Sequence, residues 1–290
     1  MPNNITLAKN YTDLLDEVYK NASVTADLVS DASMMRAGAN ANEILYPQID
    51  VSGLGDYDRN SGYTKGAVSV VWKTATFNYD RGTKLSVDTM DNQETFNIAF
   101  GMAGATLQRD KVAPEADAFT FATLAGIEGI SKATAATYED GAAFLAALLA
   151  AKSEMDEDEV PEEGRILYAT PTLLNSVIAL DTTKSKEVLN SFTVTKKVPQ
   201  SRFYTAIDLL DGKSSGEELG HYQKAATGKD INFMIVHKPA IIKFDKHTAS
   251  NIIAPENNPD SDAYISKYRK YGLVDVYKNK VAGIYLSHKA

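Results

Sequence analysis

The chain has 290 residues, of which 44% are hydrophobic and 23% charged, enough to bury a sizeable core in one or two domains. It contains no cysteine, which excludes disulfide bridges and thiolate chemistry. The net charge of −8 argues against tight binding to nucleic-acid phosphates, and no apolar run approaches the roughly 20 residues that cross a bilayer.

The first predicted element is a helix within residues 8–29, where apolar residues recur at helical spacing. Tyr11, Leu15 and Val18 follow one another at intervals of four and three residues, which places them on one helical face. The helix could pack on its own domain or form an N-terminal arm that reaches a neighbouring chain. The pattern leaves both interpretations open.

A glycine-punctuated ribbon of alternating apolar and polar residues follows, from Ile44 to Tyr79. Pro47 suits an edge strand better than a central one. A lone hairpin is marginally stable in water, and its unpaired edges favour pairing with another chain. The ribbon is therefore expected to become ordered by lying on a second copy of the protein. Asp80-Arg81-Gly82 predicts a turn after it, and Lys84–Val87 a return strand.

A long kinked helix is predicted from Asp91 to about Leu124. Asp91 and Glu94 have the spacing of a capping box, with Asp in place of the usual Ser or Thr. Pro114 is unfavourable inside a helix but suits the first turn of a renewed one, which places the kink there. One helical stripe carries Phe96, Phe100, Ala103 and Leu107.

The second half of the sequence mixes helices and strands without a regular alternation of the two, which indicates an α+β protein. Helices are predicted at 139–153 and from Thr172, with the acidic loop 154–163 and a short buried strand at 165–169 between them. Further strands are predicted at 194–199, 203–207, 233–236 and 241–244, with a flexible polar loop at 211–230. The final strands, 264–277 and 281–286, are expected to pair through a turn at 278–280.

No catalytic, cofactor or metal site is predicted from the motifs. Gly212-Lys213-Ser214-Ser215-Gly216 matches the G-x-S-x-G string of hydrolases, but acidic residues surround it where a strand and a helix are needed, which favours a surface loop. The segment from Asp56 to Ala67 begins like a calcium loop but has Ser61 for the required Gly and Ala67 for the required Glu. The four histidines show no metal-ligand spacing.

Several stretches taken together are similar to one family. They are YPQIDVSGLGDYDRNSGY (46–63), DRGTKLSVDTMDNQETF (80–96), VAPEADAFTFATLA (112–125) and, more loosely, residues 198–212 and 233–277. These stretches resemble the major capsid proteins of tailed bacteriophages that infect low-GC Gram-positive bacteria, whose shell fold is shared with encapsulins. The resemblance covers most of the chain. It lies in these stretches taken together and includes no catalytic motif.

The resemblance implies an α+β phage capsid shell fold made of several parts. Residues 1–35 would form an N-terminal arm. Residues 36–125 and 231–290 would form a peripheral domain, which includes an extended β-hairpin loop at about 45–80 and a spine helix at about 91–124. Residues 126–230 would form an axial α/β domain that meets its copies around the five-fold and six-fold axes.

The resemblance also implies a function, that of a structural protein without enzymatic activity or cofactor. Copies of the chain would assemble as hexamers and pentamers into an icosahedral shell around a double-stranded DNA genome. Scaffolding and portal proteins would be partners, the packaged DNA would not be bound specifically, and no membrane would be involved. The protein would be made in the bacterial host cytoplasm and reside in the virion.

The extended loop supplies the candidate contacts between subunits. Trp72, Phe77 and Tyr79 are predicted to anchor it, because buried aromatic residues contribute much of the energy of protein interfaces. Trp72 could instead belong to the core of its own chain. Charged residues around the loop are expected to set the register between subunits more than the affinity: Arg59, Lys65, Lys73, Arg81 and Lys84, with Asp56 and Asp58.

Three alternatives remain open at this stage. The same fold could form an encapsulin-like compartment around an enzyme. A protein of another class would be a serine hydrolase that uses Ser214. A tail or adhesion protein would form tubes or fibres instead of closed particles.

Overall fold

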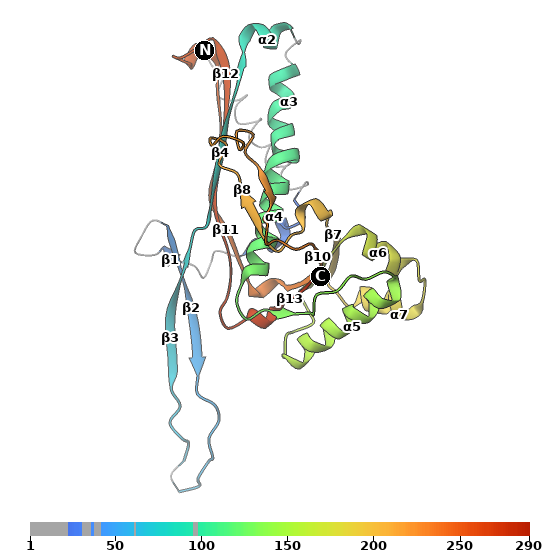
Figure 1. Ribbon diagram of the computed structural model, residues 1–290. Helices are drawn as coiled ribbons and strands as arrows, with labels where there is room; N and C mark the ends of the chain where they lie inside the picture. The colour runs from blue at the N-terminus through green and yellow to red at the C-terminus, as the bar shows by residue number, and fades with distance from the viewer. Residues whose placement is uncertain (1–22, 31–35, 38–41, 61, 95–97) are drawn as a thin grey trace.

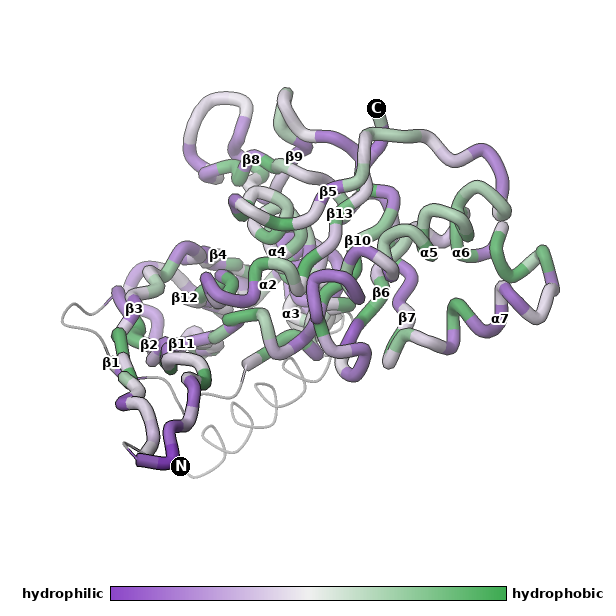
Figure 2. Tube along the Cα trace, turned by 90° about the horizontal axis from the view of Figure 1, so that it is seen from below, coloured by the Kyte–Doolittle hydropathy of each residue, from purple (hydrophilic) through white to green (hydrophobic). Residues whose placement is uncertain are grey.

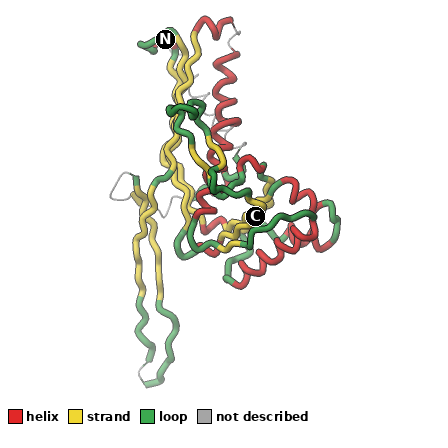
Figure 3. The backbone as a smooth tube through the Cα atoms, in the orientation of Figure 1, coloured by secondary structure: helices red, strands yellow, loops and turns green. Residues whose placement is uncertain are grey.

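The computed structural model describes residues 23–30, 36–37, 42–60, 62–94 and 98–290. A long β-hairpin projects from a body that contains two larger sheets and a long interrupted helix (Figure 1). Three long strands run beside that helix, and the second sheet lies at its foot together with three further helices (Figure 3). The prediction of a helix at 8–29 falls mostly outside the described residues. Within them, Ala26–Leu28 form a 3-10 turn.

The projecting hairpin consists of β2 (Glu43–Val51) and β3 (Val68–Thr76), with the two-residue strand β1 (Arg36–Ala37) beside β2. The strands β2 and β3 pair antiparallel along their whole length. Among the described residues, β1 pairs with Ile44 and Leu45 of β2, and Pro47 of β2 lies opposite Trp72 of β3. The edge position expected for Pro47 stays a prediction, because the chain directly before Arg36 lies outside the described residues.

The sheet beside the long helix has the order β11-β12-β4, with β4 at Tyr79–Asp88, β11 at Ile241–Ile253 and β12 at Ala263–Val276. The turn predicted at Asp80-Arg81-Gly82 is wrong, because β4 runs through these residues and pairs with β12 without a break. A Cβ at Gly82 would lie 2.8 Å from the carbonyl oxygen of Tyr268, so this glycine permits a close approach of two strands. The break between β3 and β4 falls instead at 77–78, where the Asn78 side chain bonds both N–H and C=O of Val274.

The long helix begins earlier than its predicted capping box. It consists of α2 (Thr89–Glu94), α3 (Ile98–Leu107), a π-helical turn at Gln108–Val112 and α4 (Ala113–Gly126). The Asp88 carboxylate accepts a hydrogen bond from the Met90 N–H, and Asp91 lies inside the first turn, so the cap assigned to Asp91 is wrong. The expected role of Pro114 is confirmed, since it lies at the start of α4, directly after the π-helical turn.

The second sheet has the order β5-β13-β10-β6-β7. Its strands are β5 (Ser131–Lys132), β6 (Arg165–Ala169), β7 (Val194–Lys197), β10 (Ile231–His237) and β13 (Ile284–His288). The predicted pairing of the last two strands is wrong: β13 pairs with β10 and β5, because a 3-10 turn at Val281–Gly283 carries the chain from the end of β12 to the other sheet. This sheet also crosses the boundary predicted at residue 230, since β6 and β10 are neighbours within it.

Both faces of the five-stranded sheet are buried. Alternate residues of β6 point to opposite sides: Tyr168 packs with Phe121 of α4, and Leu167 with Leu148 of a helix on the other side. The outer layer on the second side is formed by α5 (Gly141–Glu157), α6 (Pro171–Ile178) and α7 (Thr183–Asn190). The helices predicted at 139–153 and from Thr172 are thus confirmed, as is the buried strand at 165–169.

A two-stranded hairpin, β8 (Ile207–Leu209) and β9 (Tyr222–Lys224), lies between β7 and β10 in the sequence. The strand predicted at 203–207 therefore begins only at its last residue, and the polar segment 211–230 contains a strand. Further 3-10 turns lie at Gln200–Arg202, Lys238–Ala240 and Pro255–Asn257.

Candidate assembly surface

The hairpin β2–β3 exposes an unusual amount of apolar surface. Val70 and Val71 are adjacent in β3 and therefore point to opposite faces, yet both are exposed. Figure 2 views the molecule from the side of the hairpin tip and shows hydrophobic as well as hydrophilic segments around the labels β1, β2 and β3. The exposed large apolar residues of the hairpin are Ile49, Val51, Leu54, Tyr57, Tyr63, Val68, Val70, Val71 and Trp72. An apolar surface of this extent marks a site of interaction with another protein.

The tip of the hairpin is held by its own contacts. Asp58 and Gly62 exchange two backbone hydrogen bonds, and the rings of Tyr57 and Tyr63 meet edge to face with their centroids 4.9 Å apart. Gly62 has φ = +78°, a conformation that favours glycine. The tip therefore has a defined shape. The segment that resembles a calcium loop in sequence forms a compact turn.

The base of the hairpin is fixed to the body. Ile44, Tyr46 and Ala75 are buried and pack against Ile242 and Leu273 of the β11-β12-β4 sheet. The Tyr46 ring also meets Tyr277 edge to face, at 5.0 Å between centroids. Among the described residues, the base of the hairpin packs on the body and the outer half exposes both of its faces.

The predicted anchor residues lie in three different settings. Trp72 is 43% exposed on the hairpin, with the Arg36 guanidinium 5.2 Å from its ring centroid. Phe77 is half-buried and stacks on Tyr271 at 4.7 Å. Tyr79 is only 6% exposed and packs on Phe119 of α4, so it offers almost no surface to another chain.

The predicted charged residues are also dispersed. Arg59 and Lys65 are exposed near the hairpin tip, Lys73 is half-buried in β3, and Lys84 is exposed on β4. Arg81 differs from these, because it faces inward and binds a carboxylate of the long helix. Of the predicted set, Tyr79 and Arg81 bind the same carboxylate, that of Glu115.

Tyr79 and Arg81 meet at Glu115, in the first turn of α4. The Tyr79 hydroxyl donates to Oε1 of Glu115 at 3.1 Å and Arg81 Nε donates to the same oxygen at 2.7 Å. His221 Nδ1 lies 3.6 Å from Oε2, and Arg81 Nη2 donates to the His221 carbonyl oxygen at 3.2 Å. Burial alone raises the pKa of Glu115, but His221, Arg81 and Tyr79 together outweigh it and hold that pKa below its ordinary value.

An open cavity of about 470 Å³ lies beside this cluster, between β4, the long helix and the loop 210–221. Glu115 and His221 line it, and so do the exposed side chains of Lys84, Lys111 and Lys213. His221 has φ = +76°, which is unusual for a residue other than glycine. Sequence analysis missed Glu115 and His221: the sequence signal for Glu115 was a carboxylate in a mostly apolar helix, and His221 had none.

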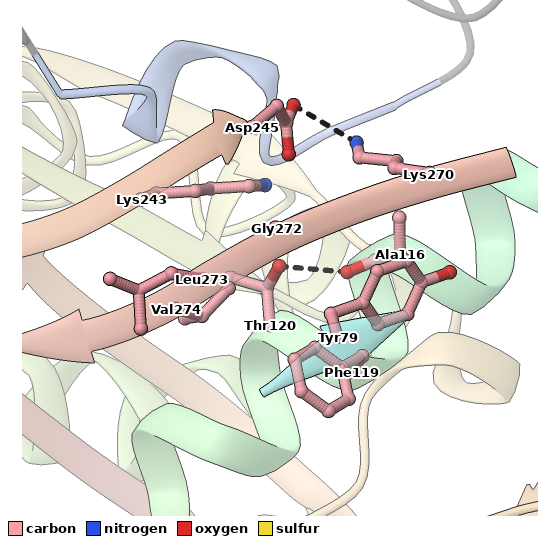
Figure 4. Close-up of a pocket in the computed structure, with 10 residues that line it drawn as sticks. All are labelled: Tyr79, Ala116, Phe119, Thr120, Lys243, Asp245, Lys270, Gly272, Leu273 and Val274. Carbon is pink, nitrogen blue, oxygen red and sulfur yellow. Dashed lines mark hydrogen bonds and ion pairs between the residues drawn. The ribbon is translucent and has the colours of Figure 1, made fainter. Parts of the chain in front are cut away.

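A much smaller void of about 10 Å³ lies between α4 and the strands β11 and β12 (Figure 4). Figure 4 shows Lys243, Asp245 and Lys270 near one another on the strand side of this void. Lys270 Nζ lies 3.1 Å from Asp245 Oδ2. Burial, together with the neighbouring Lys270, lowers the pKa of Lys243 to about 8.

The remaining motifs adopt ordinary loop geometry. Ser214 lies between β8 and β9 with no helix after it, and its hydroxyl donates to the Asp211 carboxylate at 2.5 Å, so the segment is the surface loop that sequence analysis favoured. In the described parts of the chain, no group of three or more His, Asp or Glu side chains is arranged to hold a metal ion. Among the same residues, no helix is long and apolar enough to cross a membrane.

No protein-family model matches the sequence, and no curated protein sequence matches it either. Solved structures do match in fold. The capsid of cyanophage P-SCSP1u aligns with a TM-score of 0.59 at 14% identity, over 93% of this chain and 88% of that one. The mature capsid of bacteriophage PhiM1 aligns with a TM-score of 0.57 at 13% identity, over 88% and 84%.

A virus-like particle from Pyrococcus furiosus is similar over its full length. It aligns with a TM-score of 0.60 at 12% identity, over 99% of this chain and 100% of that one. Such low identities establish the architecture and leave the function to be argued from this chain's own surface. The chain is an α+β protein with the capsid shell fold that these phage capsids and this virus-like particle share.

Proposed function

We propose that the chain is the major capsid protein of a tailed bacteriophage, and that its copies assemble into the icosahedral shell around the double-stranded DNA genome. The observation that carries this proposal is the hairpin β2–β3, whose outer half exposes apolar residues on both faces. A monomer gains nothing from such a surface, whereas a lattice of identical subunits buries it many times over. The capsid fold supports the same conclusion.

The proposal includes a division of labour along the chain. The hairpin would lie on an adjacent subunit, with Trp72 as an anchor and with Arg59 and Lys65 setting the register. The five-stranded sheet with α5–α7 would serve as the axial domain of hexamers and pentamers, with β10 and β13 belonging to it as well. The β11-β12-β4 sheet and the long helix would form the peripheral domain.

The proposed partners are copies of the chain itself, scaffolding and portal proteins, and packaged DNA that is enclosed without specific binding. The net charge of −8 supports the last point, because a wall of this charge does not attract phosphates. The protein would be made in the cytoplasm of the host and reside in the virion. We expect it to have no enzymatic activity.

The test is electron microscopy of the purified protein and of two variants that differ from it at one position of the hairpin. Val70 is half-exposed in β3, opposite Ile49. Val70→Asp should abolish closed particles, because it places a charge in the desolvated contact, while Val70→Ile should assemble like the unchanged protein. Tubes or fibres from the unchanged protein would favour a tail or adhesion role and contradict the proposal.

A second candidate is an encapsulin-like compartment around a protein cargo. It is favoured by the end-to-end match with the Pyrococcus furiosus virus-like particle, which leaves almost no part of either chain unaligned. Particles isolated from their natural source distinguish the two functions. A phage shell should contain double-stranded DNA, measured by ultraviolet absorbance and nuclease digestion, whereas a compartment should contain a second protein detectable by mass spectrometry.

A further inference from the structure

Residues 23–30 lie across the foot of the long helix as a strap that contacts three separate elements. Leu28 is fully buried among the residues of the main core. At the end of the strap, Ser30 N–H donates to the Lys243 carbonyl oxygen at 2.9 Å, and Ser30 Oγ accepts from Lys243 N–H at 3.0 Å. The strap is thereby joined to β11, and its first residues are joined to α4 and β7.

The contact with α4 is made by Asp117, which has no exposed surface. Its carboxylate accepts hydrogen bonds from Ser23 Oγ at 2.7 Å and from Thr25 Oγ1 at 2.6 Å. It also accepts from the backbone N–H groups of Val24 and Thr25, both at 3.1 Å, and from Arg202 Nη1 at 3.2 Å. A buried carboxylate needs such donors, and here the strap supplies most of them.

Cationic side chains bind the carbonyl groups of two of these residues, Val24 and Thr25. Lys196 Nζ of β7 donates to the Val24 carbonyl oxygen at 3.0 Å. Lys243 Nζ of β11 donates to the Thr25 carbonyl oxygen at 3.1 Å and to Thr25 Oγ1 at 2.7 Å. The Thr25 hydroxyl therefore links the two buried charges, since it accepts from Lys243 and donates to Asp117.

This arrangement recognises a tripeptide in detail. Backbone N–H groups meet a carboxylate, backbone C=O groups meet ammonium groups, and the hydroxyls of the first and third residues meet the carboxylate as well. The groups that bind Ser23-Val24-Thr25 are charged, so water can solvate them when the strap leaves. Water would not solvate the residues of an apolar pocket in the same way after the strap had left.

We propose that Asp117, Lys196, Arg202 and Lys243 form a peptide-recognition site for Ser23-Val24-Thr25, which locks α4 to β7 and β11 when occupied and releases them when the strap dissociates. The occupant is a segment of the same chain. It is recognised through the hydroxyl groups of its first and third residues, Ser23 and Thr25. The proposal concerns contacts inside one subunit and does not depend on the shell function.

Hydrogen exchange of the full-length protein, followed by mass spectrometry, tests the recognition. Thr25→Val keeps the shape of the side chain and removes the hydroxyl that joins Asp117 and Lys243. Exchange of the amides in 23–30 should accelerate about tenfold or more, while amides of β10 keep their protection. Thr248→Val, at an exposed position of β11, is the matched control and should change neither region. Unchanged protection of 23–30 in Thr25→Val would overturn the proposal.

Two further measurements distinguish specific recognition of the strap from a general loss of stability around it. In an Asp117→Asn background, Thr25→Val should have much less effect than in the unchanged protein, because the partner of the hydroxyl is already altered. Fully additive effects would contradict the proposed site. A synthetic peptide of residues 22–30, added in excess to the unchanged protein, should accelerate exchange of the strap, and the same peptide with Val at position 25 should not. No acceleration by either peptide would show that the strap is a fixed part of the core.

Discussion

Two buried carboxylates in the first turns of α4 act on opposite sides of the helix. Glu115 binds β4 and the loop before β9 through Arg81 and His221, while Asp117 binds the strap and Arg202. Sequence analysis assigned Arg81 to contacts between subunits, because the sequence shows its charge but cannot show a partner 34 positions away. His221 and Lys243 were missed for the same reason.

Glu115→Gln should destabilise the protein, because it leaves the half-buried Arg81 without its counter-charge. We expect a loss of about 3 kcal/mol in the free energy of unfolding, measured with urea. Because the folded pKa of Glu115 is lowered, its contribution is complete above about pH 4.3 and is lost as pH falls through the folded pKa. Asp110→Asn breaks the exposed Arg109–Asp110 pair and should leave the urea midpoint unchanged. Equal effects of the two substitutions would contradict the assignment.

Lys243 is expected to make the free energy of unfolding depend on pH in the alkaline range. Its pKa is about 8 when folded and about 10.5 when unfolded, so between these values the unfolded chain binds more protons and stability rises with pH. The rise is at most on the order of 3 kcal/mol. Lys243→Met should remove this rise, so the unfolding free energy of the unchanged protein should increase relative to that of the variant from pH 8 to pH 10.5. A constant difference would show that Lys243 is not buried as a charge.

The helices and buried strands were predictable, and their exact neighbours were not. The apolar segments of the sequence located α5, β6 and α6, and Pro114 located the interruption of the long helix. The start of that helix was missed because Thr89 N–H is held by the carbonyl oxygen of Asp262, a contact from another part of the chain. Gly82 was taken for a turn because only the folded sheet shows how close Tyr268 approaches it.

Gly82→Ala tests that interpretation at the scale of the sheet. The added methyl group would meet the backbone oxygen of Tyr268, which cannot move without disturbing β12, so we expect a loss of about 1 to 3 kcal/mol in urea unfolding. Gly53→Ala is the control, because a Cβ there meets nothing within 4 Å. If both substitutions proved neutral, close strand approach would not explain this glycine.

The fold of the whole molecule was expected from the resemblance of several sequence stretches to capsid proteins, and the solved capsid structures confirm it. The division into domains was harder, because the chain leaves the five-stranded sheet after β7 and returns to it as β10 and β13. A boundary drawn along the sequence cannot represent such a return. The predicted interface residues remain a prediction, to which the structure adds the exposed valines of β3 beside Trp72 as candidates.

The central claim is that the hairpin β2–β3 becomes covered by another copy of the chain. Cryo-electron microscopy of the assembled protein tests this most directly, at a resolution that traces the backbone. We expect closed particles in which residues 49–72 lie against an adjacent subunit and Val70 and Trp72 are buried by it. Particles whose hairpins contact only solvent or their own chain, or a preparation that contains only monomers, would contradict the account.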